Sequence, residues 1–152
     1  MIGAQVCGEA CVDVEWLLTD SRSLCFPEST LFFAIRTDRG DGHRYVRDLY
    51  ERGVRAFVVN SVQEGLAGAV QLLVQDTLTA LQRLAERHRE SYDIPVIGIT
   101  GSNGKTVIKE WLYQMLSPDM AVTRSPRSYN SQIGVPLSVW GLNSNSQIGI
   151  LE

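Results

Sequence analysis

The sequence predicts an α/β fold with two domains: a small N-terminal α/β domain over residues 1–92 and the first part of a parallel-sheet domain over residues 93–152. Strand-like and helix-like patterns alternate along the chain, which is typical of α/β proteins. A basic, polar stretch from Arg87 to Asp93 separates two apolar regions, as expected at a domain boundary. Beyond it, an apolar run enters a glycine-rich turn that leads into a helical pattern.

The first domain is expected to hold short elements. Up to about residue 26 there are only brief alternating segments, in which Val12, Val14 and Trp16 share one strand face. Strands are expected at 30–35, 54–60 and 70–74, where β-branched and apolar residues cluster. One helix stops at Gly53, and a second is capped by Asp76 or Thr77. Their inner faces carry Val46, Leu49 and Tyr50 in the first, and Leu78, Leu81, Leu84 and Ala85 in the second.

The second domain begins with an apolar run at 94–100 that is expected to form a buried parallel strand. A helix follows, because apolar residues recur at helical spacing until Pro118 ends the pattern. These residues are Ile108, Trp111, Leu112, Met115 and Leu116. The last segment, 146–152, is typical of another strand.

Composition excludes several classes of protein. The net charge of −3 disfavours nonspecific nucleic-acid binding. Apolar runs stay well short of the roughly 20 residues that span a bilayer, so no membrane association is expected. The three cysteines lack the partners of a zinc site, and the N-terminus lacks a signal-peptide pattern. We therefore expect a cytoplasmic protein with reduced thiols.

The strongest chemical signal is the stretch 96–106, VIGITGSNGKT. A strand that enters a Gly-Lys-Thr turn and then a helix is the local design of a nucleotide phosphate site. Amides of Gly101, Ser102, Asn103 and Gly104 are expected to surround the phosphates, Lys105 to supply positive charge, and the hydroxyl of Thr106 to bind Mg²⁺. The chain is thus predicted to use ATP. The strict consensus would place a glycine where Ile99 stands, and a simple strand-to-helix turn is the alternative.

Three further patches each have a plainer interpretation. Asp20-Ser21-Arg22 could be only a capped turn, and Asp41-Gly42-His43 only a helix cap with an exposed histidine. The stretch 129–137, YNSQIGVPL, could be a loop that enters a helix with Pro136 in its first turn.

In this order and spacing, the four patches resemble the Mur ligase family, and within it the MurF type. The matching residues of these patches are Asp20-Ser21-Arg22, Asp41-Gly42-His43, Thr100 to Thr106, and Asn130 to Leu137, and the strand residues Leu31-Phe32-Phe33-Ala34 are a fifth match. The resemblance covers essentially the whole chain. The sequence SPRSYNSQIGVPLSVW also looks like that of a MurF-type ligase fused ahead of an alanine racemase.

This resemblance implies an ATP-dependent amide-bond ligase of peptidoglycan synthesis, needed for cell-wall biogenesis, cell shape and division. It would join D-Ala-D-Ala to UDP-N-acetylmuramoyl-tripeptide through an acyl phosphate. Residues 1–92 would bind the UDP-muramyl peptide, with Ser21, Arg22, Asp41, Gly42 and His43 lining that pocket. Residues 93–152 would bind ATP and Mg²⁺, with Lys105 as the catalytic cation, Asn130 beside the nucleotide, and Thr106 and Glu152 as metal ligands.

Two departures from the family pattern leave roles open. Asn130-Ser131-Gln132 lacks the acidic residue often found before Ile-Gly-Val-Pro, and Arg36-Thr37-Asp38-Arg39 replaces a glycine-led approach to Asp41. A non-catalytic UDP-sugar-binding module, or another phosphate-loop ligase related to folylpolyglutamate synthase, are the alternatives. We further expect an N-terminal fragment, cut inside its nucleotide domain, that is inactive alone. Because its apolar faces are uncovered, we expect either self-association or disorder of the residues beyond about 94.

Overall fold

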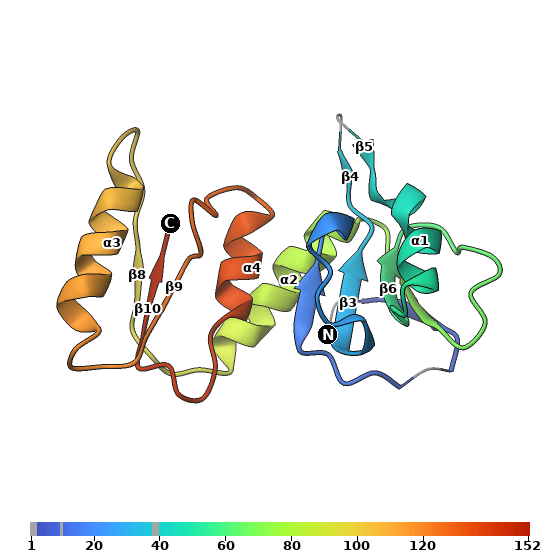
Figure 1. Cartoon of the computed structure of the whole chain (residues 1–152), viewed down its shortest axis with the longest axis horizontal. Helices are drawn as coiled ribbons and strands as arrows, with labels where there is room; N and C mark the ends of the chain where they lie inside the picture. The colour runs from blue at the N-terminus through green and yellow to red at the C-terminus, as the bar shows by residue number, and fades with distance from the viewer. Residues whose placement is uncertain (1–2, 10, 38–39) are drawn as a thin grey trace. The chain divides into compact units, whose positions relative to one another are not determined.

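The computed structural model describes residues 3–9, 11–37 and 40–152 and has two compact units, Met1–Leu81 and Gln82–Glu152. Figure 1 shows its elements in chain order. No helix among the described residues has both the length and the apolar character needed to cross a membrane. The strands are β1 (Gln5–Cys7), β2 (Trp16–Leu18), β3 (Thr30–Phe33), β4 (Arg36–Thr37), β5 (Gly40–Asp41), β6 (Ala56–Val59), β7 (Val70–Leu73), β8 (Val96–Gly98), β9 (Val122–Arg124) and β10 (Ile148–Leu151). The helices are η1 (Ser21–Ser23), η2 (Pro27–Ser29), η3 (Gly42–Tyr45), α1 (Val46–Glu51), α2 (Thr77–Glu90), α3 (Lys105–Leu116) and α4 (Gly134–Trp140).

The first unit is built on a five-stranded sheet of order β1-β7-β6-β3-β2. Four strands run parallel, and β1 pairs with β7 in the antiparallel sense. Every residue of β3 and β6 is buried, which explains their unbroken apolar sequences. The rings of Phe32 and Phe57 meet edge to face, with centroids 6.4 Å apart, and anchor this core. The expected strands at 30–35, 54–60 and 70–74 are confirmed as β3, β6 and β7.

Both expected helices of this region are present. Helix α1 buries Val46 and Leu49, and the chain leaves it through Gly53, whose φ of 103° favours glycine. Helix α2 is capped by Asp76, which accepts hydrogen bonds from the amides of Leu78 (3.2 Å) and Thr79 (3.0 Å). Of the two candidate caps, Asp76 therefore has this role.

The expected strand face of Val12, Val14 and Trp16 is wrong. Strand β2 begins only at Trp16, which lies opposite Thr30 in the register. The amide of Glu15 still donates to the carbonyl of Ser29 at 3.0 Å, but no strand is assigned from Val12 to Val14. Val12 and Val14 therefore lie outside the strands of the sheet.

The second unit contains a three-stranded parallel sheet of order β8-β10-β9. The expected terminal strand is confirmed as β10, which is central, and Ile150 in it has no exposed surface. Helices α3 and α4 flank these strands in Figure 1. The expectation of a buried strand at 94–100 is only half right, because β8 is parallel but partly exposed. Its one described strand neighbour is β10, so its other edge is not covered by a strand of this sheet.

Helix α3 confirms the helical spacing and ends at Leu116, before Pro118. Its apolar residues are less buried than the pattern suggests. Trp111 is 63% exposed and Met115 72% exposed, and Val107 and Ile108 are also exposed. The periodicity therefore marks a real apolar face that the described residues leave open.

Candidate functional site

The glycine-rich loop after β8 forms an open turn at the start of α3. Gly101 and Gly104 have φ values of 138° and 78°, and a Cβ at either position would meet nothing within 4 Å. The space beside these glycines is therefore free for a ligand. Lys105 is the first residue of α3, and its Nζ donates to the carbonyl of Gly101 at 2.7 Å. Free amides of a helix start and an adjacent ammonium group together suit an anionic phosphate.

Three residues that the sequence proposed for ATP and Mg²⁺ meet at the carboxyl end of β10. The hydroxyl of Thr106 donates to the carboxylate of Glu152, at 2.9 Å from Oε1 and 3.0 Å from Oε2. The side-chain amide of Asn130 donates to Oε1 of Glu152 at 3.1 Å. These residues come from α3, the loop before α4, and the end of β10, so the fold converges them from three segments.

Sequence reasoning missed three residues of this site. Ser128 places its hydroxyl 3.3 Å from that of Thr106, and Ser125 Oγ accepts from the amide of Glu152 at 3.0 Å. Lys109 has no exposed side-chain surface, and its Nζ lies 3.5 Å from Oε2 of Glu152. A signal for Lys109 was available, because it stands three residues after Thr106 and so shares a helix face with it.

The Glu152 carboxylate is held in its charged form. Burial, the largest single influence, opposes the charge, since the side chain is only 1% exposed. The hydrogen bonds from Thr106 and Asn130 and the positive charge of Lys109 together outweigh it, so the pKa of Glu152 lies below its ordinary value. A buried, ionised carboxylate is therefore available at the end of the phosphate loop.

The donor set fits Mg²⁺ better than a softer metal. The convergent groups are a carboxylate and hydroxyls, which are hard oxygen donors. Across the described residues there is no cluster of three or more His, Cys, Asp or Glu that could hold a metal by itself. One carboxylate and one hydroxyl beside a phosphate site is the arrangement Mg²⁺ uses when substrate phosphates and water complete its shell.

The Asp20-Ser21-Arg22 turn directly follows β2. Asp20 caps η1 by accepting from the amide of Arg22 at 3.1 Å, and the Arg22 guanidinium grips both oxygens of the same carboxylate at 2.9 and 2.7 Å. The hydrogen bonds from the Arg22 side chain, together with the one from its main-chain amide, lower the pKa of Asp20. Ser21 is buried, and its carbonyl accepts from Arg52 at 2.9 Å. The Arg22 side chain itself is 88% exposed and can reach a ligand.

The Asp41-Gly42-His43 loop is more constrained than an exposed cap. Asp41 accepts from the amide of His43 at 2.9 Å and from its Nδ1 at 2.6 Å. The amide of Asn60 points at Nε2 at 3.2 Å, so Nε2 is the acceptor and Nδ1 carries the proton. The His43 side chain is 10% exposed. The plainer interpretation of an exposed histidine is therefore wrong. Asp38 and Arg39, part of the departure before this loop, lie outside the described residues.

Both loops lie at the same edge of the first sheet. The Asp20 turn follows β2, the Gly42 amide binds the carbonyl of Ile35 just after β3, and Asn60 follows β6. Because β2, β3 and β6 are parallel, these positions share the carboxyl edge, where open α/β sheets bind ligands.

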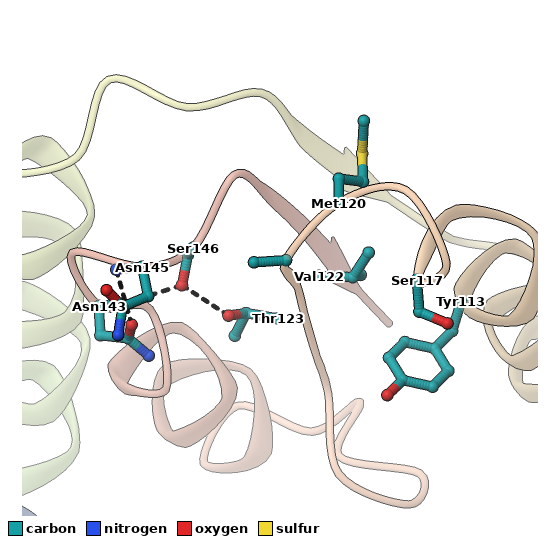
Figure 2. A pocket seen from close by; sticks show the side chains of 9 residues that line it. Tyr113, Ser117, Met120, Val122, Thr123, Asn143, Asn145 and Ser146 are labelled. Atoms are coloured by element: carbon teal, nitrogen blue, oxygen red, sulfur yellow. Dashed lines mark hydrogen bonds between the residues drawn. The ribbon is translucent and has the colours of Figure 1, made fainter.

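Pockets in the described part of the chain include two that are lined by residues of the second unit. The first, about 410 Å³, is shown in Figure 2, where Ser146 hydrogen-bonds to Thr123 at 2.6 Å. It lies at the end of α3 and the start of β9, opposite the phosphate loop, and holds none of the predicted site residues. The second, about 510 Å³, is lined by Asn130, by the exposed Gln132 and by residues of α2 and α4. It therefore adjoins the site through Asn130.

Comparison with known proteins agrees with this geometry. Residues 99–152 match the Mur ligase middle domain. The UDP-N-acetylmuramoyl-tripeptide–D-alanyl-D-alanine ligase of Bacillus subtilis is 36% identical over 140 residues, which is 91% of this chain and 30% of that protein. MurF of Acinetobacter baumannii superposes with a TM-score of 0.83 at 31% identity, over 91% of this chain and 30% of its own.

The chain is therefore similar to Mur ligases over most of its length, and residues 99–152 match the middle domain of that family. The Bacillus subtilis relative and the Acinetobacter baumannii structures that it resembles are of the MurF type, as the sequence predicted. MurF from Thermotoga maritima, in complex with ADP, superposes with a TM-score of 0.73 at 28% identity, over 90% of this chain and 31% of its own. The chain spans about 30% of the length of the curated relatives that it matches.

Proposed function

We propose that this chain is the part of a MurF-type ligase that binds the UDP end of UDP-N-acetylmuramoyl-tripeptide and the phosphates of ATP with Mg²⁺. The convergence of Thr106, Asn130 and Glu152 beside the phosphate loop carries the proposal. The ADP complex of the Thermotoga maritima relative supports the nucleotide part. The complete ligase would join D-Ala-D-Ala to the tripeptide.

The two ligands are proposed to bind in different parts of the chain. Ser21, Arg22 and the Asp41–His43 loop would hold the uridine diphosphate, and all of them lie in the unit that ends at Leu81. The residues proposed for ATP lie beyond β8, in the unit that begins at Gln82. The compact units divide within α2, whereas the functional boundary that we propose stays at 92/93, before the nucleotide strand.

In the proposed reaction, a peptide carboxylate oxygen attacks the γ-phosphorus of ATP and ADP leaves, which gives an acyl phosphate. The amine of D-Ala-D-Ala then attacks the acyl carbon, phosphate leaves and the amine loses a proton. Negative charge builds up on oxygen in both steps. Lys105 and the amides at the start of α3 would stabilise this charge. Thr106 and Glu152 would hold Mg²⁺, which screens the phosphates when bound.

Calorimetry on this chain tests the proposal, with UDP-N-acetylmuramoyl-tripeptide, UMP and ATP–Mg²⁺ as separate ligands. We expect saturable binding of the UDP ligand that weakens with His43→Ala, because this change frees Asp41 and the Asn60 amide and loosens the loop. We expect ATP–Mg²⁺ binding to weaken with Lys105→Ala while UDP binding stays unchanged.

The two variants serve as controls for each other. Equal losses of both ligands in both variants would indicate general unfolding rather than two sites. A folded wild-type chain that binds none of the ligands would contradict the proposed function.

A further inference from the structure

Lys109 is buried in the nucleotide unit but has no part in the proposed chemistry. Its side chain has no exposed surface. Its Nζ lies 3.5 Å from a carboxylate oxygen of Glu152 and 3.5 Å from one of Glu110. It also donates a hydrogen bond to the main-chain carbonyl of Arg127. These three contacts hold the buried ammonium group in one position, because a buried charge that left its polar partners would be unpaired, which is costly.

The contact between Lys109 and Arg127 also involves an unusual backbone conformation. The φ of 51° at Arg127 places this residue in the left-handed region, which non-glycine residues seldom adopt. The turn that it forms leads directly to Ser128 and Asn130, the residues that contact Thr106 and Glu152. A strained turn persists only where its surroundings hold it, and the described partner of the Arg127 carbonyl is Lys109.

Helix α3 carries both ends of this arrangement. Thr106 and Lys109 are three residues apart and therefore lie on one helix face. Thr106 meets the Glu152 carboxylate at 2.9 and 3.0 Å, and Lys109 meets it from the next turn. The same helix begins with Lys105 in the phosphate loop.

We propose that Lys109 is a positioning residue for the Mg²⁺ site. Its ammonium group fastens the Glu152 carboxylate and the Arg127 carbonyl together, and so holds Glu152, Ser128 and Asn130 around the ion position before nucleotide binds. The identity of the ion rests on the proposed function. Removal of a residue that orients a metal ligand typically lowers metal affinity 10–100-fold.

Two measurements on this chain test the inference, with Lys109→Met as the variant. Hydrogen–deuterium exchange of ligand-free protein reports on residues 125–131. Calorimetry gives the ADP affinity with Mg²⁺ and with EDTA. We expect exchange at 125–131 to accelerate by about tenfold or more, and ADP affinity to fall by about tenfold with Mg²⁺ but to change little with EDTA.

Glu110→Gln is the matched control. It removes the other carboxylate partner of Lys109 and leaves Glu152 in place. Both readouts should stay within about twofold of wild type, since Glu110 contacts neither the Arg127 carbonyl nor Thr106 in the described contacts.

A pair of further variants covers the case in which Lys109→Met does not fold. Glu152→Gln should keep the 125–131 turn protected, because Lys109 still binds Arg127. Glu152→Gln with Lys109→Met, which leaves no unpaired Glu152 carboxylate, should lose that protection.

Unchanged exchange and an unchanged Mg²⁺ effect in folded Lys109→Met would overturn this inference alone. An equal loss of ADP affinity with and without Mg²⁺ would also overturn it, since a merely structural lysine would behave in that way. A wild-type chain whose ADP affinity ignores Mg²⁺ would refute the inference and the proposed metal site together.

Discussion

Three aspartates perform the same task at three places in the first unit. The side chains of Asp20, Asp41 and Asp76 each accept a hydrogen bond from the main-chain amide two residues later, at 3.1, 2.9 and 3.2 Å. Each caps the helix that follows, and the pKa of each is lowered. Two of these caps shape the loops proposed for the UDP ligand, so the same side chains support both folding and the site.

Acid should weaken the Asp41 cap. The hydrogen bond from the His43 amide, followed by that from the His43 ring, lowers the pKa of Asp41. Because the folded-state pKa lies below the ordinary value of 3.8, the stabilisation is complete above that value and is lost as the pH falls through the folded-state pKa. Urea unfolding at pH 6 and at pH 3 gives the free energy of unfolding at each pH. This free energy should fall less between pH 6 and pH 3 in Asp41→Asn than in wild type. The same loss in both proteins would contradict this prediction.

At the residue scale, the sequence indicated the loop of Asp41 and His43 but not its rigidity. The second ring nitrogen of His43 is fixed by Asn60, 17 residues away and on another strand end. A local pattern holds no trace of such a contact. The helix spacing could have placed Lys109 on the same face as Thr106, but its contact with Glu152 could not be predicted locally, since that carboxylate is 43 residues further along the chain.

At the element scale, the start of η3 depends on close backbone packing. A Cβ on Gly42 would lie 2.8 Å from the amide nitrogen of Ile35 and 2.9 Å from the carbonyl carbon of Ala34. Both neighbours are main-chain atoms that follow β3 and cannot simply rotate away. Glycine is therefore required here for space rather than for an unusual φ.

Gly42→Ala should consequently destabilise the first unit by roughly 1–3 kcal/mol, the usual cost of forced overpacking. Gly40→Ala is the control, because a Cβ there would meet nothing within 4 Å. Thermal unfolding followed by circular dichroism would measure both. A midpoint for Gly42→Ala as high as that of Gly40→Ala would show that the loop relaxes without cost.

Periodicity predicted most elements but not their surroundings. Apolar spacing correctly located α3, yet Ile108, Trp111 and Met115 are 46%, 63% and 72% exposed. A repeat of 3.6 residues reports that a helix has an apolar face, not which segment covers it. The two-residue strands β4 and β5 and the three-residue β9 escaped prediction because runs this short carry too little periodicity.

At the scale of the whole molecule, each of the two compact units has a hydrophobic core among its described residues. One surrounds Phe32 and Phe57 in the first unit, and the other joins Ala85, Leu142 and Leu151 in the second. The sequence predicted an α/β fold with parallel sheets, and this is confirmed. It could not supply the order β1-β7-β6-β3-β2, since strand order depends on pairings between distant segments.

The open face of α3 leads to a prediction for the chain in solution. The exposed apolar side chains of this helix are Val107, Ile108, Trp111 and Met115, and exposed apolar surface favours association. We expect concentration-dependent self-association in multi-angle light scattering, and Trp111→Ser should weaken it. Val62→Ser, which changes a residue that is 50% exposed in the first unit, should not. A monomer at every concentration tested would contradict the prediction.

The placement of lysine makes the chain its own chemical probe. The sequence contains two lysines, and both lie on α3. Lys105 is partly exposed at the phosphate loop, whereas Lys109 is wholly enclosed. An amine-selective acylating reagent therefore meets one reactive lysine side chain in the folded protein, at the position where phosphate is proposed to bind. The extent of labelling at Lys105 would report whether the phosphate loop is occupied. Labelling at Lys109 would report opening of the fold.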